Sequence, residues 1–112
     1  MSLICLVTAM TAEAKPLVEA FNLKPLPQKG LSAWLGDGVC LVQTGMGLQR
    51  AEARIDALLG VQLGINAFIN VGIAGGKRDL GSVILASSVQ DQLSGKIWYP
   101  HLPPKGLSLI HI

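Results

Sequence analysis

The stretch INAFINVGIAGGKRDLG, residues 65–81, decides the class of fold. An apolar segment rich in strand-forming residues passes into glycines and then into charged residues, which is typical of a buried strand that ends in a loop. Glycines at such a place serve a tight turn or let the backbone approach another group closely. The stretch therefore raises two questions: which fold contains this strand, and what purpose the glycines at its end serve.

Outward from this stretch, apolar and amphipathic segments alternate along the chain. The first helix is expected to take Thr11 as its N-cap and to carry Glu13 in its first turn, with Pro16 tolerable only near its start. The pattern predicts strands at residues 3–8, 31–35, 39–44, 67–71 and 82–89, a second helix at about 48–63, a loop at 25–30 and a hairpin turn at 36–38.

Strands that alternate with helices, several of them almost uniformly apolar, favour an α/β fold with a largely parallel or mixed central sheet covered by helices on both faces. We expect one domain over residues 1–112, with an irregular tail from about residue 94. Ligands of such sheets gather at the carboxyl ends of the strands. Three loops are therefore expected along one rim, at residues 8–13, 44–47 and 72–76.

Composition limits the setting of the protein. Half of the residues are apolar, 14% are charged and the net charge is +2, without the basic stripe that a nucleic-acid-binding surface needs. Residues 57–76 lack charge over about the length of a membrane span, but their glycines and amides indicate a helix, a turn and a strand instead. Cys5 and Cys40 lie in apolar runs and are expected to be free buried thiols in a cytoplasmic protein, with no metal and no cofactor.

Two of the loops partly match nucleotide-binding motifs. GMGLQR, residues 45–50, has Arg50 where a dinucleotide fingerprint needs a small residue, and no acidic residue stands about twenty positions further on. GIAGGKR, residues 72–78, is too short before its lysine for a phosphate-binding loop. Taken alone, either loop is best explained by glycines that adopt positive φ in turns. A dinucleotide-binding domain is left as a third hypothesis.

Together the motifs are more informative. The strand ending in AMTAE (9–13), the segment GVCLVQTGMG (38–47) before a helix, and INVGIAGG (69–76) followed by LGSVILA (80–86) resemble the nucleoside phosphorylase superfamily. Within it, the resemblance is closest to the methylthioadenosine/S-adenosylhomocysteine nucleosidases and the futalosine hydrolases. It extends from about residue 3 to about residue 91.

The resemblance implies cleavage of the N-glycosidic bond of a purine nucleoside, through a cationic sugar that a nearby carboxylate would stabilise. Glu13 matches the glutamate that helps to activate the attacking water. The residues that match substrate contacts are Met10 near the ribose, Met46 beside the sugar and its 5′ substituent, and Ile73, Ala74 and Gly75 at the end of the strand. Ile73 stands where the nucleosidases usually have a serine and cannot donate that hydrogen bond, which favours the futalosine-hydrolase-like relatives.

Water is the expected nucleophile, because the loop at residues 8–13 offers a carboxylate and no arginine to anchor phosphate. A phosphate-dependent nucleoside phosphorylase and a non-catalytic nucleoside-binding module remain alternatives. From position alone, Glu13 would more simply serve the dipole of its helix.

The family extends beyond the point where this sequence ends, and its ribose-binding glutamate and base-protonating aspartate have no match here. The resemblance therefore predicts an apparently truncated fold and weak or absent turnover by the chain itself. It also implies a homodimer or another homo-oligomer, since family members commonly pair.

Overall fold

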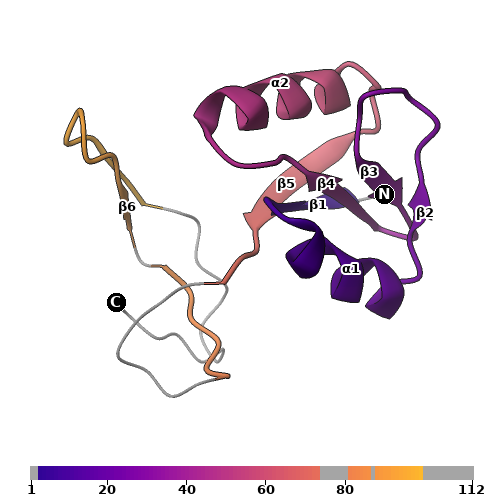
Figure 1. Ribbon diagram of the computed structural model, residues 1–112, viewed down its shortest axis with the longest axis horizontal. Coiled ribbons are helices and arrows are strands. Elements are labelled where there is room, and N and C mark those ends of the chain that lie inside the picture. The colour runs from indigo at the N-terminus through magenta and orange to yellow at the C-terminus, as the bar shows by residue number, and fades with distance from the viewer. Residues whose placement is uncertain (1–2, 74–80, 87, 100–112) are drawn as a thin grey trace. The chain divides into compact units, whose positions relative to one another are not determined.

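The computed structural model describes residues 3–73, 81–86 and 88–99 (Figure 1). The chain forms two compact units, which comprise residues 1–74 and 75–112. Each unit is considered by itself below.

The first unit is built on a five-stranded mixed sheet with the order β2-β3-β4-β1-β5. β1 pairs in parallel with β4 on one side and with β5 on the other, while β3 pairs antiparallel with both β2 and β4. The strands are β1 (Leu3–Thr8), β2 (Lys24–Pro25), β3 (Ala33–Leu35), β4 (Val39–Gln43) and β5 (Ile65–Asn70). The prediction of an α/β fold with a mixed central sheet is confirmed.

Two helices cover opposite faces of this sheet (Figure 1). α1 (Thr11–Ala20) covers the face with Leu6 and Leu41, and α2 (Leu48–Leu59) covers the face with Cys5 and Val42. Because β1 and β4 are covered on both faces, the interior residues of both are apolar without alternation, as their sequences LICLVT and VCLVQ show. The predicted coverage by helices on both faces is therefore observed.

The first helix departs from the prediction at its start and in its middle. Its N-cap is Met10 rather than Thr11, while Glu13 lies in the first turn, as predicted, and is the third helical residue. Pro16 lies inside the helix, which continues to Ala20. The packing of α1 against the sheet compensates for the backbone hydrogen bond that a proline cannot donate. Asn22, with φ of 52°, then ends the helix in the left-handed conformation.

The second helix and the strand after it are shifted from their predicted bounds. α2 ends at Leu59, because Gly60 is its C-cap and Gln62 adopts a left-handed φ of 59°, although the apolar spacing had suggested a helix to residue 63. β5 therefore begins at Ile65 rather than at residue 67. In the described ranges, residues 3–73, 81–86 and 88–99, no helix is long and apolar enough to cross a membrane.

The second unit contains one short hairpin of β6 (Val89–Gln90) and β7 (Ile97–Trp98). The Asp91 carboxylate shapes its turn by accepting hydrogen bonds from the Leu93 N–H and the Ser94 hydroxyl, each at 3.0 Å. Lys96 places its ammonium 5.0 Å from the centre of the Trp98 ring. The predicted strand at 82–89 is wrong for residues 82–86, which form no strand, whereas Val89 is in β6. Val83 is largely exposed, and none of the described strands pairs with residues 81–86.

Candidate functional site

The loops that follow β1, β4 and β5 meet at one rim of the sheet. The Thr44 N–H donates to the Thr8 carbonyl at 2.8 Å, and the Gly45 N–H donates to the Ala9 carbonyl at 3.0 Å. On the other side of β1, the Val71 N–H donates to the Val7 carbonyl at 2.8 Å. Within the described part of the loops, the predicted gathering at the carboxyl ends of the parallel strands is therefore observed.

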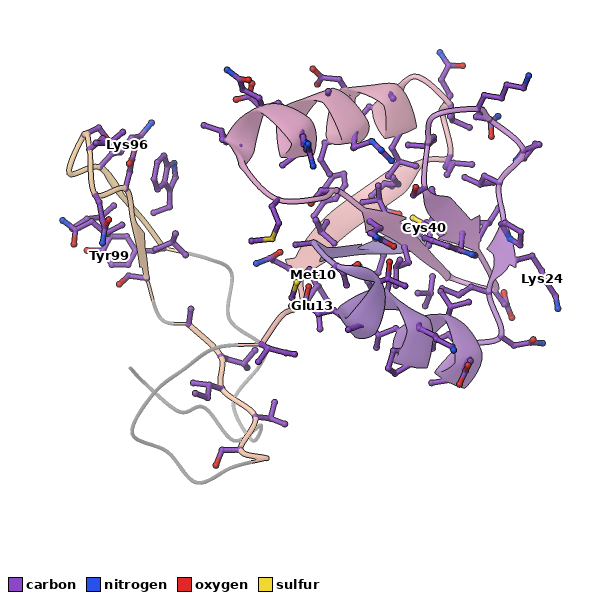
Figure 2. All side chains as sticks on the ribbon, viewed as in Figure 1. Met10, Glu13, Lys24, Cys40, Lys96 and Tyr99 are labelled. Carbon is purple, nitrogen blue, oxygen red and sulfur yellow. The ribbon has the colours of Figure 1, made fainter. Side chains whose placement is uncertain are left out.

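The Glu13 carboxylate is the centre of this rim, close to Met10 (Figure 2). Its Oε1 accepts hydrogen bonds from the Ala9 and Met10 N–H groups, both at 3.1 Å. Its Oε2 accepts a hydrogen bond from the Ile73 N–H at 2.9 Å. One carboxylate thus joins the start of α1 to the segment that leaves β5, sixty residues further along the chain.

These three donors favour the charged form of the carboxylate. The Ile73 N–H, and after it the Met10 N–H, hold the pKa of Glu13 below its ordinary value; desolvation opposes them, and the Ala9 N–H makes the smallest contribution. Glu13 is consequently ionised at neutral pH. A carboxylate has about four acceptor positions, so the hydrogen bonds described here leave room on Oε2 for a further donor such as water.

Gly72 allows Glu13 to reach this position. A Cβ on Gly72 would lie 3.0 Å from Oε2 of Glu13, which is closer than almost all real contacts of that kind. Gly72 is not among the glycines with positive φ, whereas Gly45 and Gly47 are. The expectation of glycines used for left-handed turns is thus right for the loop at 44–47 and wrong for Gly72, where the absence of a side chain serves close approach.

The predicted contact residues differ in how well the structure places them. Met10 is the N-cap of α1 and is partly exposed, while Met46 lies in the loop between β4 and α2 with 66% of its surface exposed. The side chain of Ile73 is 80% exposed, although its N–H is tied to Glu13. Ala74 and Gly75 lie outside the described residues. The structure therefore brings Glu13, Met10 and the Ile73 backbone together, with Met46 on the adjacent loop.

Polar side chains behind the rim were not singled out from the sequence. Thr8, the last residue of β1, and Thr44, the residue after β4, are both buried. The Thr44 hydroxyl donates to the Gly45 carbonyl at 2.9 Å. Gln43 donates from Nε2 to the Thr11 hydroxyl at 3.0 Å and so links β4 to the first turn of α1. The signal that could have identified them is a polar residue at the end of each otherwise apolar strand.

Arg50, in the first turn of α2, supplies a positive charge next to the loop after β4. A Cβ placed on Gly45 would lie 3.3 Å from Cδ of Arg50 and 3.9 Å from its Nη1. The aliphatic stem of Arg50 therefore packs over the backbone of the loop. The sequence alone indicates only that Arg50 occupies the position where a dinucleotide motif needs a small residue. Within the described ranges of the chain, no group of three His, Cys, Asp or Glu residues could hold a metal ion.

Comparison with known families gives a match over most of the chain. Residues 3–105 match the family model described as the phosphorylase superfamily, which covers all strands and both helices of the first unit and the hairpin of the second. Comparison with curated proteins found no match.

Proposed function

The chain belongs to the phosphorylase superfamily, and from this premise we propose that it serves to cleave the N-glycosidic bond of a purine nucleoside with water. The observation that carries the proposal is the ionised Glu13 carboxylate at the rim, held by N–H groups from the segment after β1 and from the segment after β5. Among the described residues, no other carboxylate is fixed by the loops that follow the parallel strands.

A carboxylate of this kind suits the chemistry of the reaction. Departure of the base leaves positive charge on the sugar, and a fixed negative charge nearby lowers the energy of that transition state without having to reorganise. The lowered pKa of Glu13 keeps the charge in place over the neutral pH range. The open acceptor position on Oε2 can orient an attacking water, which is the role that the family resemblance implies for this residue.

Apolar side chains around the carboxylate suit a nucleoside with an apolar 5′ substituent. Met10 and Met46 present exposed thioether side chains on neighbouring loops, and Ile73 presents an exposed aliphatic side chain. Methionine adapts to irregular ligand shapes and makes favourable contacts with aromatic rings. We therefore place methylthioadenosine, adenosylhomocysteine and futalosine first among the candidate substrates, with Ala74 and Gly75 as further backbone contacts.

Arg50 favours phosphorolysis as a second candidate. Its guanidinium stem packs on Gly45, and an arginine close to the rim could anchor a phosphate nucleophile through paired hydrogen bonds. Water remains the preferred nucleophile, because the loop at residues 8–13, which carries Glu13, contains no cation.

The test measures release of free base from the three nucleosides, with and without phosphate, by the purified 112-residue chain. The matched variants are Glu13→Gln and Glu19→Gln, since Glu19 is an exposed carboxylate on the same helix. We expect release that needs no phosphate, and a fall of about 10²–10⁴-fold in Glu13→Gln alone. Release that depends on phosphate, and that Arg50→Gln but not Arg54→Gln abolishes, would establish the phosphorylase instead.

Calorimetry measures the binding of the same nucleosides independently of their cleavage. Binding is measured for every substrate, including any from which no base is released. Binding without release by the wild-type chain would favour the nucleoside-binding module. Neither binding nor release would contradict the proposal.

The partners of the chain are part of the same proposal. We propose a cytoplasmic homo-oligomer that acts on a small nucleoside without nucleic acid, membrane or cofactor. The buried free thiols of Cys5 and Cys40 support a reducing location.

A further inference from the structure

Cys5 and Cys40 are direct neighbours across two strands of the main sheet. They are partners in the parallel register of β1 and β4. Neighbouring strands lie about 4.8 Å apart, and the Cα atoms of residues joined by a disulfide usually lie about 4.4–6.8 Å apart. The pairing of the two strands therefore places both residues within reach of such a bond.

The side chains of this pair point to the same face of the sheet. Both cysteines belong to the buried cluster under α2, whereas Leu6 and Leu41, the residues that follow them, belong to the cluster under α1. This difference agrees with the alternation of side chains along a strand. The two thiols also share a hydrogen bond, so their sulfur atoms are already in contact. A covalent bond between them needs no change of register.

The surroundings of the pair leave a single disulfide open to the chain. Sγ of Cys5 lies 3.7 Å from the Leu6 carbonyl oxygen, and the other buried members of the cluster are apolar. The chain contains two cysteines in all, so a disulfide within one chain can join these two alone. The chemistry proposed for Glu13 involves neither of them.

We propose that Cys5 and Cys40 form a site of reversible disulfide exchange, whose co-substrate is a small organic disulfide such as oxidised glutathione. The S–S bond of the co-substrate breaks and takes up two electrons, while the S–S bond between Cys5 and Cys40 forms. The two thiol protons pass by way of solvent to the two small thiols that are released. In excess reduced thiol the reaction runs backward and restores both cysteines. The proposal does not depend on the nucleoside chemistry.

Burial determines when the exchange takes place. Both thiols are fully buried, so a small disulfide meets them in an opened chain. The first thiol to react becomes a mixed disulfide, and the return of β4 to β1 brings the second sulfur against it and expels the remaining glutathione. The closed bond is reversible, whereas oxidation of an exposed thiol to the sulfinic acid is not. The pair therefore acts as a lock that an oxidising solution closes and a reducing solution opens.

The experiment brings the full chain to equilibrium with mixtures of reduced and oxidised glutathione, in native buffer and in concentrated urea. Alkylation of the remaining thiols traps the products, and mass spectrometry counts them. Trypsin cleaves after Lys29, between the two cysteines, so a linked pair of peptides identifies the bond. The equilibrium constant for closure is expected to be at least about tenfold larger in native buffer than in urea. Chain entropy alone allows roughly 10²–10³-fold for a loop of this length.

Cys5→Ala and Cys40→Ala are the matched controls, since each keeps one thiol and cannot close the bond. Each is expected to form a mixed disulfide with glutathione in urea and much less of it in native buffer, where the remaining thiol is buried. Circular dichroism shows whether the variants fold. Should they not fold, the wild type decides alone, because its closed form must have a higher urea midpoint than its reduced form.

Three results would each overturn the proposal. The first is closure that is no more favourable in native buffer than in urea. The second is a native product dominated by mixed or intermolecular disulfides. The third is a urea midpoint of the closed form that equals or falls below that of the reduced form.

Discussion

Glu13 combines a structural and a candidate chemical role in one side chain. From sequence position alone, a carboxylate in the first turn of a helix is explained by the helix dipole, and Oε1 does accept two N–H groups at the start of α1. The helix dipole does not account for the contact of Oε2, which accepts the N–H of Ile73 beyond β5. Loss of this carboxylate is therefore expected to loosen the rim as well as to remove its charge.

The lowered pKa of Glu13 predicts a specific dependence of stability on pH. Its pKa is lower in the folded chain than the ordinary value of 4.5, so folding is favoured by ionisation of this group. That contribution is fully present above the unfolded pKa and is lost as pH falls through the lower, folded pKa. Thermal melts of the wild type and Glu13→Gln should therefore differ most near neutral pH and converge in acid.

The control for this effect is Glu19→Gln, on the same helix but exposed to solvent. Its melting temperature should differ little from that of the wild type, because an exposed side chain contributes little to stability. If the Glu13→Gln difference instead widened on acidification, the three N–H groups would not be stabilising the charged form.

The bond between Glu13 and Ile73 could not have been predicted from the sequence. Motif resemblance identified both residues, but for Ile73 it drew attention to a side chain that lacks a hydroxyl. The contact is made by the backbone, and it depends on how β5 is aligned with β1. That alignment includes a shift of register between Leu3 and Ile4, which is set by packing over the whole sheet and not by local residue preference.

At the level of elements, α2 allows the contribution of a buried leucine to stability to be compared with that of an exposed leucine in the same helix. Leu58 is fully buried in the cluster formed with Cys5 and Val42, whereas its neighbour Leu59 is 51% exposed. Leu58→Ala is expected to lower the free energy of unfolding by about 2–5 kcal/mol, through lost burial and a residual cavity. Leu59→Ala is expected to change it by less than about 1 kcal/mol. Urea denaturation of both variants measures the contrast.

Equal losses in the two variants would mean that α2 is not seated on the sheet through Leu58. A second readout is the slope of the urea transition, which should stay constant if only the folded state is affected.

The elements themselves could be predicted to different degrees. The long apolar strands β1 and β4 were predicted to within one residue at their carboxyl ends, because continuous burial leaves a clear signature. β2 and β7, each only two residues long, were missed because they are defined by their partners and not by their own composition. The end of α2 was placed too late, since Gly60 outweighs the apolar spacing beyond it.

For the molecule as a whole, Cys5 and Cys40 report on global unfolding. They are paired in register on β1 and β4, and both are fully buried and free, as the sequence predicted. The hydrogen bond with Cys40, together with burial, raises the pKa of the Cys5 thiol far above its usual range. Because both thiols are also out of reach of solvent, an aromatic disulfide reagent should modify the native chain at least about 10³-fold more slowly than the urea-unfolded chain. Rapid modification of native protein would contradict this.

The architecture of the first unit was predictable, while the composition of its rim was only partly so. Alternation of apolar strands and amphipathic helices indicated the α/β class and the edge at which the loops gather. The roles of Gly72, Gln43 and Arg50 emerge only when distant segments are brought together. The single domain expected over residues 1–112 stays a prediction.

The strand order β4-β1-β5 has a consequence for synthesis of the chain. β1 is made first but lies between strands that are made later, and the Thr8 hydroxyl reaches the Val42 carbonyl across 34 residues. At typical elongation rates of about 5–20 residues per second, an apolar segment without a neighbour would wait for about 2–7 s after leaving the ribosome. During that interval, LICLVT is a natural target for a chaperone, since α1, β2 and β3 are all made before β4, its first partner strand.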